Sequence, residues 1–299
     1  YGMKVGEDGG FINRTSELIS KARTLRPGAS YRQGFGEAAI DGFNFMVNAA
    51  VPLSKKTELY AFGGRNYRDT DAYAFSRDNE TPRNVIGIYP HGFTPRITSI
   101  ITDGSMSAGL RHEMDNGWKV DFNNTFGKNK FHYQIKNTIN ASLEEASPTE
   151  FDAGGHSLSQ NTTGLDFSKY YKNILKGFNL ALGTEYRTEN FIIFAGETGS
   201  YAVYDVNGVP VTNPSQQIPV DPVTGEERPG GSQGFPGYSP ANTVDKFRSN
   251  LSFYVDSEIN LSDAFLLSGA LRYEDYSDFG NTVNYKLASR YKISDALAL

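Results

Sequence analysis

The chain has 299 residues, and its 29 Lys and Arg against 34 Asp and Glu give a formal net charge of −5. This balance argues against a nucleic-acid partner, which favours a basic surface, and the absence of Cys excludes disulfide scaffolds, Cys-bound zinc and thiol catalysis. The longest unbroken apolar run, 191–195, is far shorter than the roughly 18 residues of a membrane-spanning helix.

Residues 1–41 are expected to form an exterior loop segment that precedes the first complete strand. The chain begins with Tyr1, and no charged-then-apolar leader follows it, so no signal peptide is expected. At the other end, a new strand opens at Leu297. We therefore interpret the chain as a piece of a longer protein.

Apolar residues recur with a period of two along most of residues 42–299, and this period indicates β-strands. In the clearest case, Phe247, Leu251 and Phe253 share one face, while Arg248 and Asn250 share the other. The pattern predicts nine strands, and a tenth opens near the end of the chain: 42–51, 57–67, 105–114, 118–132, 160–171, 177–195, 246–259, 264–275 and 281–293. Most of them are about twice as long as a usual globular strand and near the length that crosses a bilayer at a tilt.

Short and long connections alternate between these strands, except at 276–280. The turn at 115–117 predicts a register, because pairing Met114 with Trp118 aligns the apolar faces of both strands and gives Gly117 the left-handed position. The long connections are expected at 68–104, 133–159 and 196–245. In an up-and-down barrel every second turn lies on the same rim, so the alternation predicts short periplasmic turns and long exterior loops.

The fold class is therefore predicted to be all-β, an antiparallel up-and-down meander of about nine to ten long strands. Strands with one apolar face also fit an antiparallel sheet on a soluble core, so a secreted β-sandwich or β-solenoid stays open. A membrane barrel is favoured because the inward faces keep charged and amide residues along their length, and Phe and Tyr lie near the strand ends as in interfacial girdles.

Three segments resemble TonB-dependent outer-membrane receptors: 177–187 with 195–197, 230–238, and 271–280. The third, which reads Leu-Arg-Tyr-Glu-Asp-Tyr-Ser-Asp-Phe-Gly, is the most specific of them. The resemblance covers about residues 30–299. It implies that residues 42–299 are part of a 22-stranded transmembrane barrel whose lumen is filled by an N-terminal plug.

The resemblance also implies a function: uptake of a scarce siderophore, haem, cobalamin or oligosaccharide, driven by the TonB complex through a TonB box. It places the protein in the outer membrane of a Gram-negative bacterium, with membrane lipid, the plug, the TonB complex and the ligand as partners, and without enzyme activity. Neither the plug nor the TonB box is expected within this chain. A passive porin-like channel stays open as an alternative, as does a secreted adhesin or carbohydrate-binding module.

Ligand selectivity is expected in the long exterior loops, where aromatic rings can stack on sugars or siderophore rings and arginines can bind carboxylates or chelated oxygens. The candidates are Tyr73, Phe75, Tyr89, His91, Phe93, Tyr201, Tyr204, Phe235 and Tyr238. The same loops carry Arg77 and Arg83. Alternatively, the aromatic residues form small cores of the loops themselves.

A second set of residues is expected to face the lumen and to pair with one another or with the plug: Arg187, Arg248, Arg272, Glu274, Lys286 and Arg290. No metal site is expected, because the four His are at least 20 residues apart and the acidic segments 205–208 and 221–226 lack EF-hand spacing. The sequence also lacks a nucleophile elbow, a P-loop and a Rossmann motif, so neither a catalytic residue nor a cofactor is expected.

Overall fold

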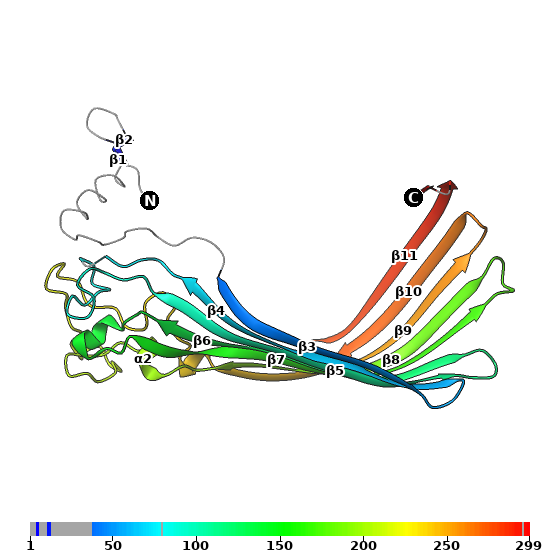
Figure 1. Ribbon diagram of the computed structural model, residues 1–299, viewed down its shortest axis with the longest axis horizontal. Coiled ribbons are helices and arrows are strands. Elements are labelled where there is room, and N and C mark those ends of the chain that lie inside the picture. Colours follow the sequence, from blue (N-terminus) through cyan, green and yellow to red (C-terminus); the bar gives the residue numbers. More distant parts are fainter. Residues whose placement is uncertain (1–3, 6–10, 13–37, 79, 295) are drawn as a thin grey trace.

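The computed structural model describes residues 4–5, 11–12, 38–78, 80–294 and 296–299. Its main element is a strongly curved antiparallel sheet of ten strands, in which every spatial neighbour is also a neighbour in sequence (Figure 1). A separate two-stranded sheet pairs β1 (Lys4–Val5) with β2 (Phe11–Ile12). The predicted up-and-down meander is confirmed.

The strands of the main sheet are β3 (Ala39–Pro52), β4 (Thr57–Tyr73), β5 (Arg96–Glu113), β6 (Lys119–Lys136), β7 (Glu150–Tyr171), β8 (Phe178–Phe194), β9 (Val244–Asn260), β10 (Phe265–Tyr276), β11 (Gly280–Ser294) and β12 (Leu297–Ala298). Short helical turns occur only in the loops of the described chain: η1 (Ala141–Ala146), α2 (Thr198–Tyr201) and η2 (Pro240–Asn242). In the residues that the structure describes, no helix has the length and apolar character needed to cross a membrane.

Several strands extend further toward the long loops than the sequence pattern predicts. β5 begins at Arg96 and β7 at Glu150, about ten residues before the predicted starts. These extensions carry polar residues on both faces, so the alternation of apolar and polar residues ends there. The backbone pairing with the neighbouring strands nevertheless continues. The long connections are therefore 74–95, 137–149 and 195–243. The predicted bounds of the first two were too wide, whereas those of the third agree within two residues. Most of the predicted loop segment 1–41 lies outside the described residues.

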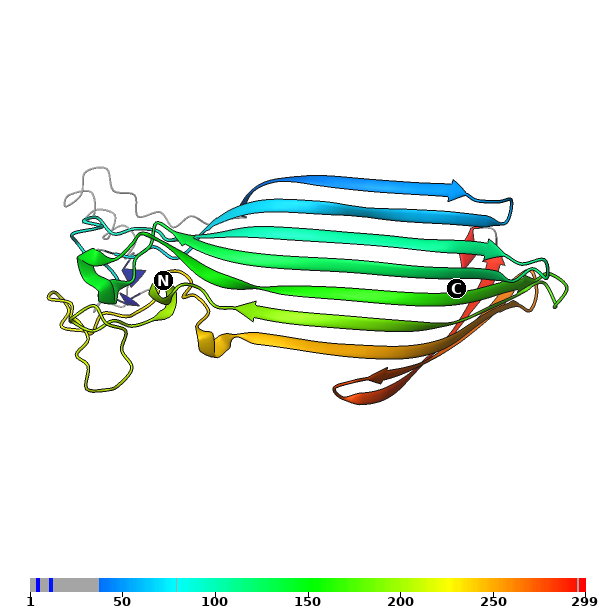
Figure 2. The same ribbon diagram turned by 90° about the horizontal axis from the view of Figure 1, so that it is seen from below.

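The connections divide between two rims of the sheet. The short ones between β3 and β10 gather at one end of the strands, which we call the short-turn rim, and the long ones gather at the opposite end, the long-loop rim (Figure 2). At 114–118 the predicted register is confirmed: Leu110 pairs with Phe122, the Met114 N–H donates to the Trp118 carbonyl at 2.8 Å, and Gly117 has φ +83°.

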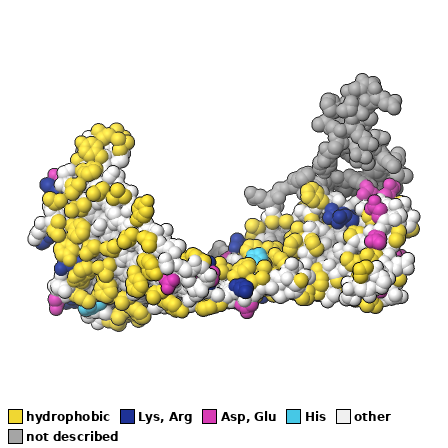
Figure 3. Space-filling view, turned by 180° about the vertical axis from the view of Figure 1, so that it is seen from behind, with side chains coloured by type: hydrophobic (Ala, Val, Ile, Leu, Met, Phe, Trp, Pro, Cys, Tyr) yellow, Lys and Arg dark blue, Asp and Glu magenta, His cyan; other side chains and the backbone are white. Residues whose placement is uncertain are grey.

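The two faces of the sheet differ in chemistry, because successive side chains of a strand point to opposite faces. On the apolar face, Phe247, Phe253 and Leu287 are 64%, 51% and 77% exposed. Hydrophobic side chains gather over the arm of the sheet that holds β9–β11 (Figure 3). These residues share one outer surface and do not meet in a sealed centre, as they would in a soluble β-sandwich.

The buried hydrophobic cluster lies at the long-loop rim, away from the middle of the sheet. Val85 and Phe93 of the 74–95 loop pack there with Ile139 of the 137–149 loop. Each of these side chains is at most 7% exposed. The long loops are therefore packed on one another and present a structured surface.

Gly154 lies at a bulge in β7, opposite the register shift between Tyr133 and Gln134 of β6. Its φ is +75°, and a Cβ atom there would lie 2.4 Å from the Phe194 carbonyl oxygen. We expect Gly154→Ala to lower the unfolding free energy of the intact protein by at least about 1 kcal/mol, because the new methyl group is strained and also clashes.

The urea midpoint of the reconstituted protein measures this effect. Gly208→Ala is the matched control, since Gly208 has φ +72° but a Cβ atom there would meet nothing within 4 Å. Equal midpoints for the two variants would contradict a steric requirement at Gly154.

Candidate functional site

Charged side chains alternate on the polar face of β8–β10, where residues two apart in a strand project to the same side. Arg272 lies at the centre: its Nη2 is 3.0 Å from Glu185 Oε1, and its Nε is 3.1 Å from Glu274 Oε1. Arg187 Nη2 is 3.9 Å from the same Glu274 oxygen. Arg248 pairs with Glu189 of β8.

The structure brings four of the six predicted lumen residues into this charge network: Arg187, Arg248, Arg272 and Glu274. Lys286 and Arg290 lie on the polar face of β11, in register with Ala270 and Leu266, and make no ion pair within the described chain. The acidic partners Glu185 and Glu189 were not among the predicted lumen residues. Both share the period of Arg187 in β8, which is the signal that identifies them.

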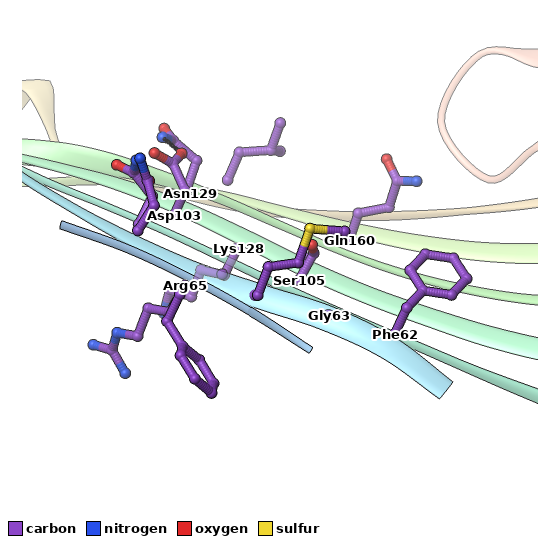
Figure 4. A pocket seen from close by; sticks show the side chains of 16 residues that line it. Phe62, Gly63, Arg65, Asp103, Ser105, Lys128, Asn129 and Gln160 are labelled. Atoms are coloured by element: carbon purple, nitrogen blue, oxygen red, sulfur yellow. Dashed lines mark hydrogen bonds between the residues drawn. The ribbon is translucent and has the colours of Figure 1, made fainter. Parts of the chain in front are cut away.

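The polar face of β4–β6 contains a groove lined by small residues. Gly64, Ser105 and Gly127 form one cross-strand row, and their small side chains leave its floor open. Asp103 and Gln160 stand on the same side of the sheet at the edges of the groove (Figure 4). A row of this kind allows another segment or a ligand to approach the backbone closely.

Aromatic side chains from the long loops cover the upper polar face. The ring of Tyr133 in β6 lies 5.2 Å from Phe235, and Phe235 contacts Tyr238 edge to face at 5.8 Å. Since Phe235 and Tyr238 belong to the 195–243 connection, this long loop folds inward over the sheet. Tyr133 was not among the predicted candidates, although it was counted within the long connection 133–159.

Two of the predicted loop aromatics form a small core, as the alternative interpretation proposed. Tyr89 and Phe93 stack at 4.5 Å and pack with Val85 and Ile139. Burial raises the pKa of the Tyr89 hydroxyl. These two rings support the loop and do not present a binding surface.

The remaining predicted candidates are spread over the long-loop rim. Tyr73 is 60% exposed on the apolar face, with the Arg96 guanidinium 5.5 Å from its ring centre, and Phe75 is 70% exposed. His91 is exposed, whereas Tyr201 and Tyr204 are half-buried in the 195–243 connection. The nine predicted ligand residues therefore do not converge on one site; of them, only Phe235 and Tyr238 lie over the polar face with Tyr133.

Two arginines meet at one amide oxygen on the long-loop rim. Arg77 Nε and Arg83 Nη1 both donate to Gln233 Oε1, each at 3.3 Å. Neither guanidinium forms an ion pair within the described part of the chain. Burial and the adjacent Arg83 charge lower the pKa of Arg77. Positive charge is thus concentrated here, and no carboxylate of the described residues pairs with it, so the environment favours an anion.

Gln233 is held in place by backbone hydrogen bonds to the neighbouring loop. Its N–H donates to Thr138 Oγ1 at 2.8 Å, and its carbonyl accepts from the same hydroxyl at 2.9 Å. The residue is 3% exposed. The two arginines are therefore positioned by a residue more than 140 positions away in the sequence.

No group of three or more His, Cys, Asp or Glu side chains able to hold a metal ion occurs within the described residues. His132, one of the four histidines, is hydrogen-bonded through Nε2 to the carboxylate of Asp152 at 2.9 Å.

Comparison with known proteins agrees with this architecture. Residues 16–299 match the family described as TonB dependent receptor-like, beta-barrel. Among solved structures, the chain is similar to the ferric-catecholate import receptor Fiu of E. coli K12 in its closed form, with a TM-score of 0.50 and 10% identity over 88% of this chain and 43% of that chain. This likeness shows the fold.

Two further structures come from Pseudomonas aeruginosa. The siderophore receptor PirA has a TM-score of 0.42 and 13% identity over 87% of this chain and 38% of that chain. The pyoverdine outer membrane receptor FpvA has a TM-score of 0.41 and 11% identity over 87% of this chain and 43% of that chain. The chain spans about two fifths of the length of these structures. A comparison with curated proteins gave no match.

Proposed function

This chain belongs to the TonB-dependent receptor-like β-barrel family, and we propose that it is part of an outer-membrane receptor that binds a scarce ligand at its long-loop rim and imports it with TonB-coupled energy. Members of the family are transporters of the Gram-negative outer membrane and not enzymes. In this proposal the apolar face contacts lipid, the long-loop rim faces the exterior and the short-turn rim faces the periplasm.

The polar face then lines the lumen, and a plug domain is its partner. The groove at Gly64, Ser105 and Gly127 supports this assignment, because it admits a closely packed segment between charged and amide side chains. The charge network around Arg272 supports it as well, since polar groups of this density suit a wet or plugged interior.

The proposed class of ligand rests on one observation: Arg77 and Arg83 both bind the side chain of Gln233. Two guanidinium groups without a carboxylate favour an anionic ligand, and Arg binds planar oxygen pairs bidentately. We therefore propose an anionic ferric siderophore of the catecholate type as the ligand. The aromatic pair Phe235 and Tyr238, which lies over the polar face, supplies rings for stacking.

Replacing both arginines in Arg77→Gln/Arg83→Gln is expected to weaken binding of a ferric dihydroxybenzoate complex to the intact receptor by at least about tenfold, because charge-assisted hydrogen bonds are lost. Equilibrium binding with the radioactive iron complex measures the effect. Lys172→Gln, in an exposed turn at the short-turn rim, is the matched control.

A neutral ferric hydroxamate complex serves as the second probe. Equal affinity of the wild type and the double variant for the anionic complex would contradict the role of Arg77 and Arg83. Preference of the wild type for the neutral complex would contradict the ligand class.

Energy coupling is tested separately by uptake in cells that lack TonB. We expect surface binding to persist in these cells and import of the iron complex to stop. Import that continues at the normal rate would identify a passive porin-like channel instead.

A further inference from the structure

The apolar face carries two exposed cations at the edge of its hydrophobic band. In the paired register, Arg65 of β4 lies opposite Gly104 of β5, and Gly104 lies opposite Lys128 of β6. Arg65 and Lys128 are both exposed. Arg65 projects from the side of the sheet opposite to Asp103 (Figure 4).

Gly104 leaves an open slot between the two cations. A Cβ atom at Gly104 would meet only the Gly64 carbonyl oxygen, at 3.9 Å, so nothing in the described chain fills this position. Because neighbouring strands are about 4.8 Å apart, the backbones that carry Arg65 and Lys128 are separated by about 10 Å. Two long, flexible side chains across such a gap can reach one group from both sides.

The charge of the two cations is uncompensated within the described residues. Neither Arg65 nor Lys128 forms an ion pair there. On this face of β3 and β4 the nearest carboxylates are Asp41 and Asp69, which pair with each other four residues further toward the long-loop rim, a distance of about 13 Å. Lys130 adds a third positive charge one row above Lys128, with its Nζ 4.9 Å from the ring centre of Phe194.

Hydrophobic side chains lie beside and directly below the cations, on the side of the short-turn rim. Phe45, Met106 and Phe126 are 62%, 61% and 45% exposed, and all three belong to the apolar face. One row above, the stacked rings of Phe43 and Tyr67 share the face with Lys130, so the cations lie where the apolar band gives way to a mixed aromatic and cationic surface. The order of apolar and cationic groups along this surface is complementary to a membrane lipid, in which an anionic phosphate group adjoins the acyl chains.

We propose that Arg65 and Lys128 clamp the phosphate of an anionic membrane lipid over the Gly104 slot, while its acyl chains lie against Phe45 and Phe126. The proposal rests on the proposed membrane location of the apolar face. Cationic side chains at the edge of a membrane-embedded surface attract anionic headgroups, and Arg supplies a bidentate contact to phosphate.

The test uses the intact receptor in vesicles of phosphatidylcholine that contain a minor fraction of phosphatidylglycerol. Co-flotation reports insertion, and analysis of the lipids that remain bound after mild detergent extraction reports the preference for phosphatidylglycerol. We expect the wild type to enrich phosphatidylglycerol, and Arg65→Gln/Lys128→Gln to reduce this enrichment by about fivefold for each charge removed.

Three further variants separate charge from fold. Arg65→Lys/Lys128→Arg is expected to keep the enrichment, whereas Gly104→Met is expected to reduce it without a change in charge, because the side chain occupies the slot. Lys286→Gln removes one charge from the polar face and is expected to leave the enrichment unchanged.

Equal enrichment in the wild type and in Arg65→Gln/Lys128→Gln would overturn the lipid site, as would a wild type without preference for phosphatidylglycerol. Failure of the wild type to insert into the vesicles at all is a different result. It would overturn the membrane location itself and the lipid site with it.

Discussion

Arg228→Met is expected to loosen the attachment of the 195–243 connection to the 74–95 loop and to cost the loop structure about 3–5 kcal/mol. Arg228 is 6% exposed, its Nη2 lies 3.0 Å from Asp221 Oδ1, and its Nη1 donates to the Asn84 carbonyl at 2.5 Å. Removal of the guanidinium leaves the Asp221 carboxylate, which is 4% exposed, as an uncompensated buried charge. Such a charge is more costly than the loss of the pair as a whole.

The rate of limited proteolysis of the intact receptor in the 195–243 connection measures this effect. Asp221→Asn/Arg228→Met is expected to recover much of the resistance, because no buried charge remains. Arg96→Met is the matched control, since Arg96 pairs with Asp71 at the same rim but is 42% exposed, and its loss is expected to cost less than about 1 kcal/mol. Cleavage of Arg228→Met at the wild-type rate would contradict the predicted role of the ion pair.

Arg272→Met is expected to lower the unfolding free energy of the intact barrel by about 2–3 kcal/mol. The arginine lies between Glu185 and Glu274, and its removal leaves these two carboxylates close together, with Arg187, at 3.9 Å from Glu274, as the one cation that still pairs with either of them in the described chain. The expected cost is below that of a fully buried pair because the Arg272 side chain is 31% exposed, so that water screens part of the interaction.

The urea midpoint of the reconstituted receptor measures the loss. Glu185→Gln in the Arg272→Met background is expected to restore part of it, because one of the two facing charges is removed. Arg290→Met is the control, because Arg290 lies on the same polar face but makes no ion pair in the described chain. Its urea midpoint is expected to stay near the wild-type value, which would show that the loss of an arginine from this face does not by itself lower the midpoint. Equal shifts for Arg272→Met and Arg290→Met would contradict a specific network.

Local pattern in the sequence was enough to predict the meander and the register of the hairpin at 115–117. The alternation of apolar and polar residues identifies each face of a strand, and a slip of one residue would invert the faces, so the turn at 115–117 admits one pairing. The same alternation places Arg187 and Arg272 on one face with their acidic partners, because Arg187–Glu274 and Arg272–Glu185 join β8 and β10 across β9, whose register with both strands is regular.

Only the tertiary structure decided where the long loops begin and end and how they pack on one another. The upper ends of β5 and β7 were missed because polar and apolar residues are mixed on both of their faces there, so hydrogen bonding to neighbouring strands, and not periodicity, keeps them extended. Likewise, Gln233 joins Arg77 across 156 residues, and Arg228 reaches Asn84 across 144. Contacts this distant depend on the packing of whole loops, which leaves no periodic signal in the chain.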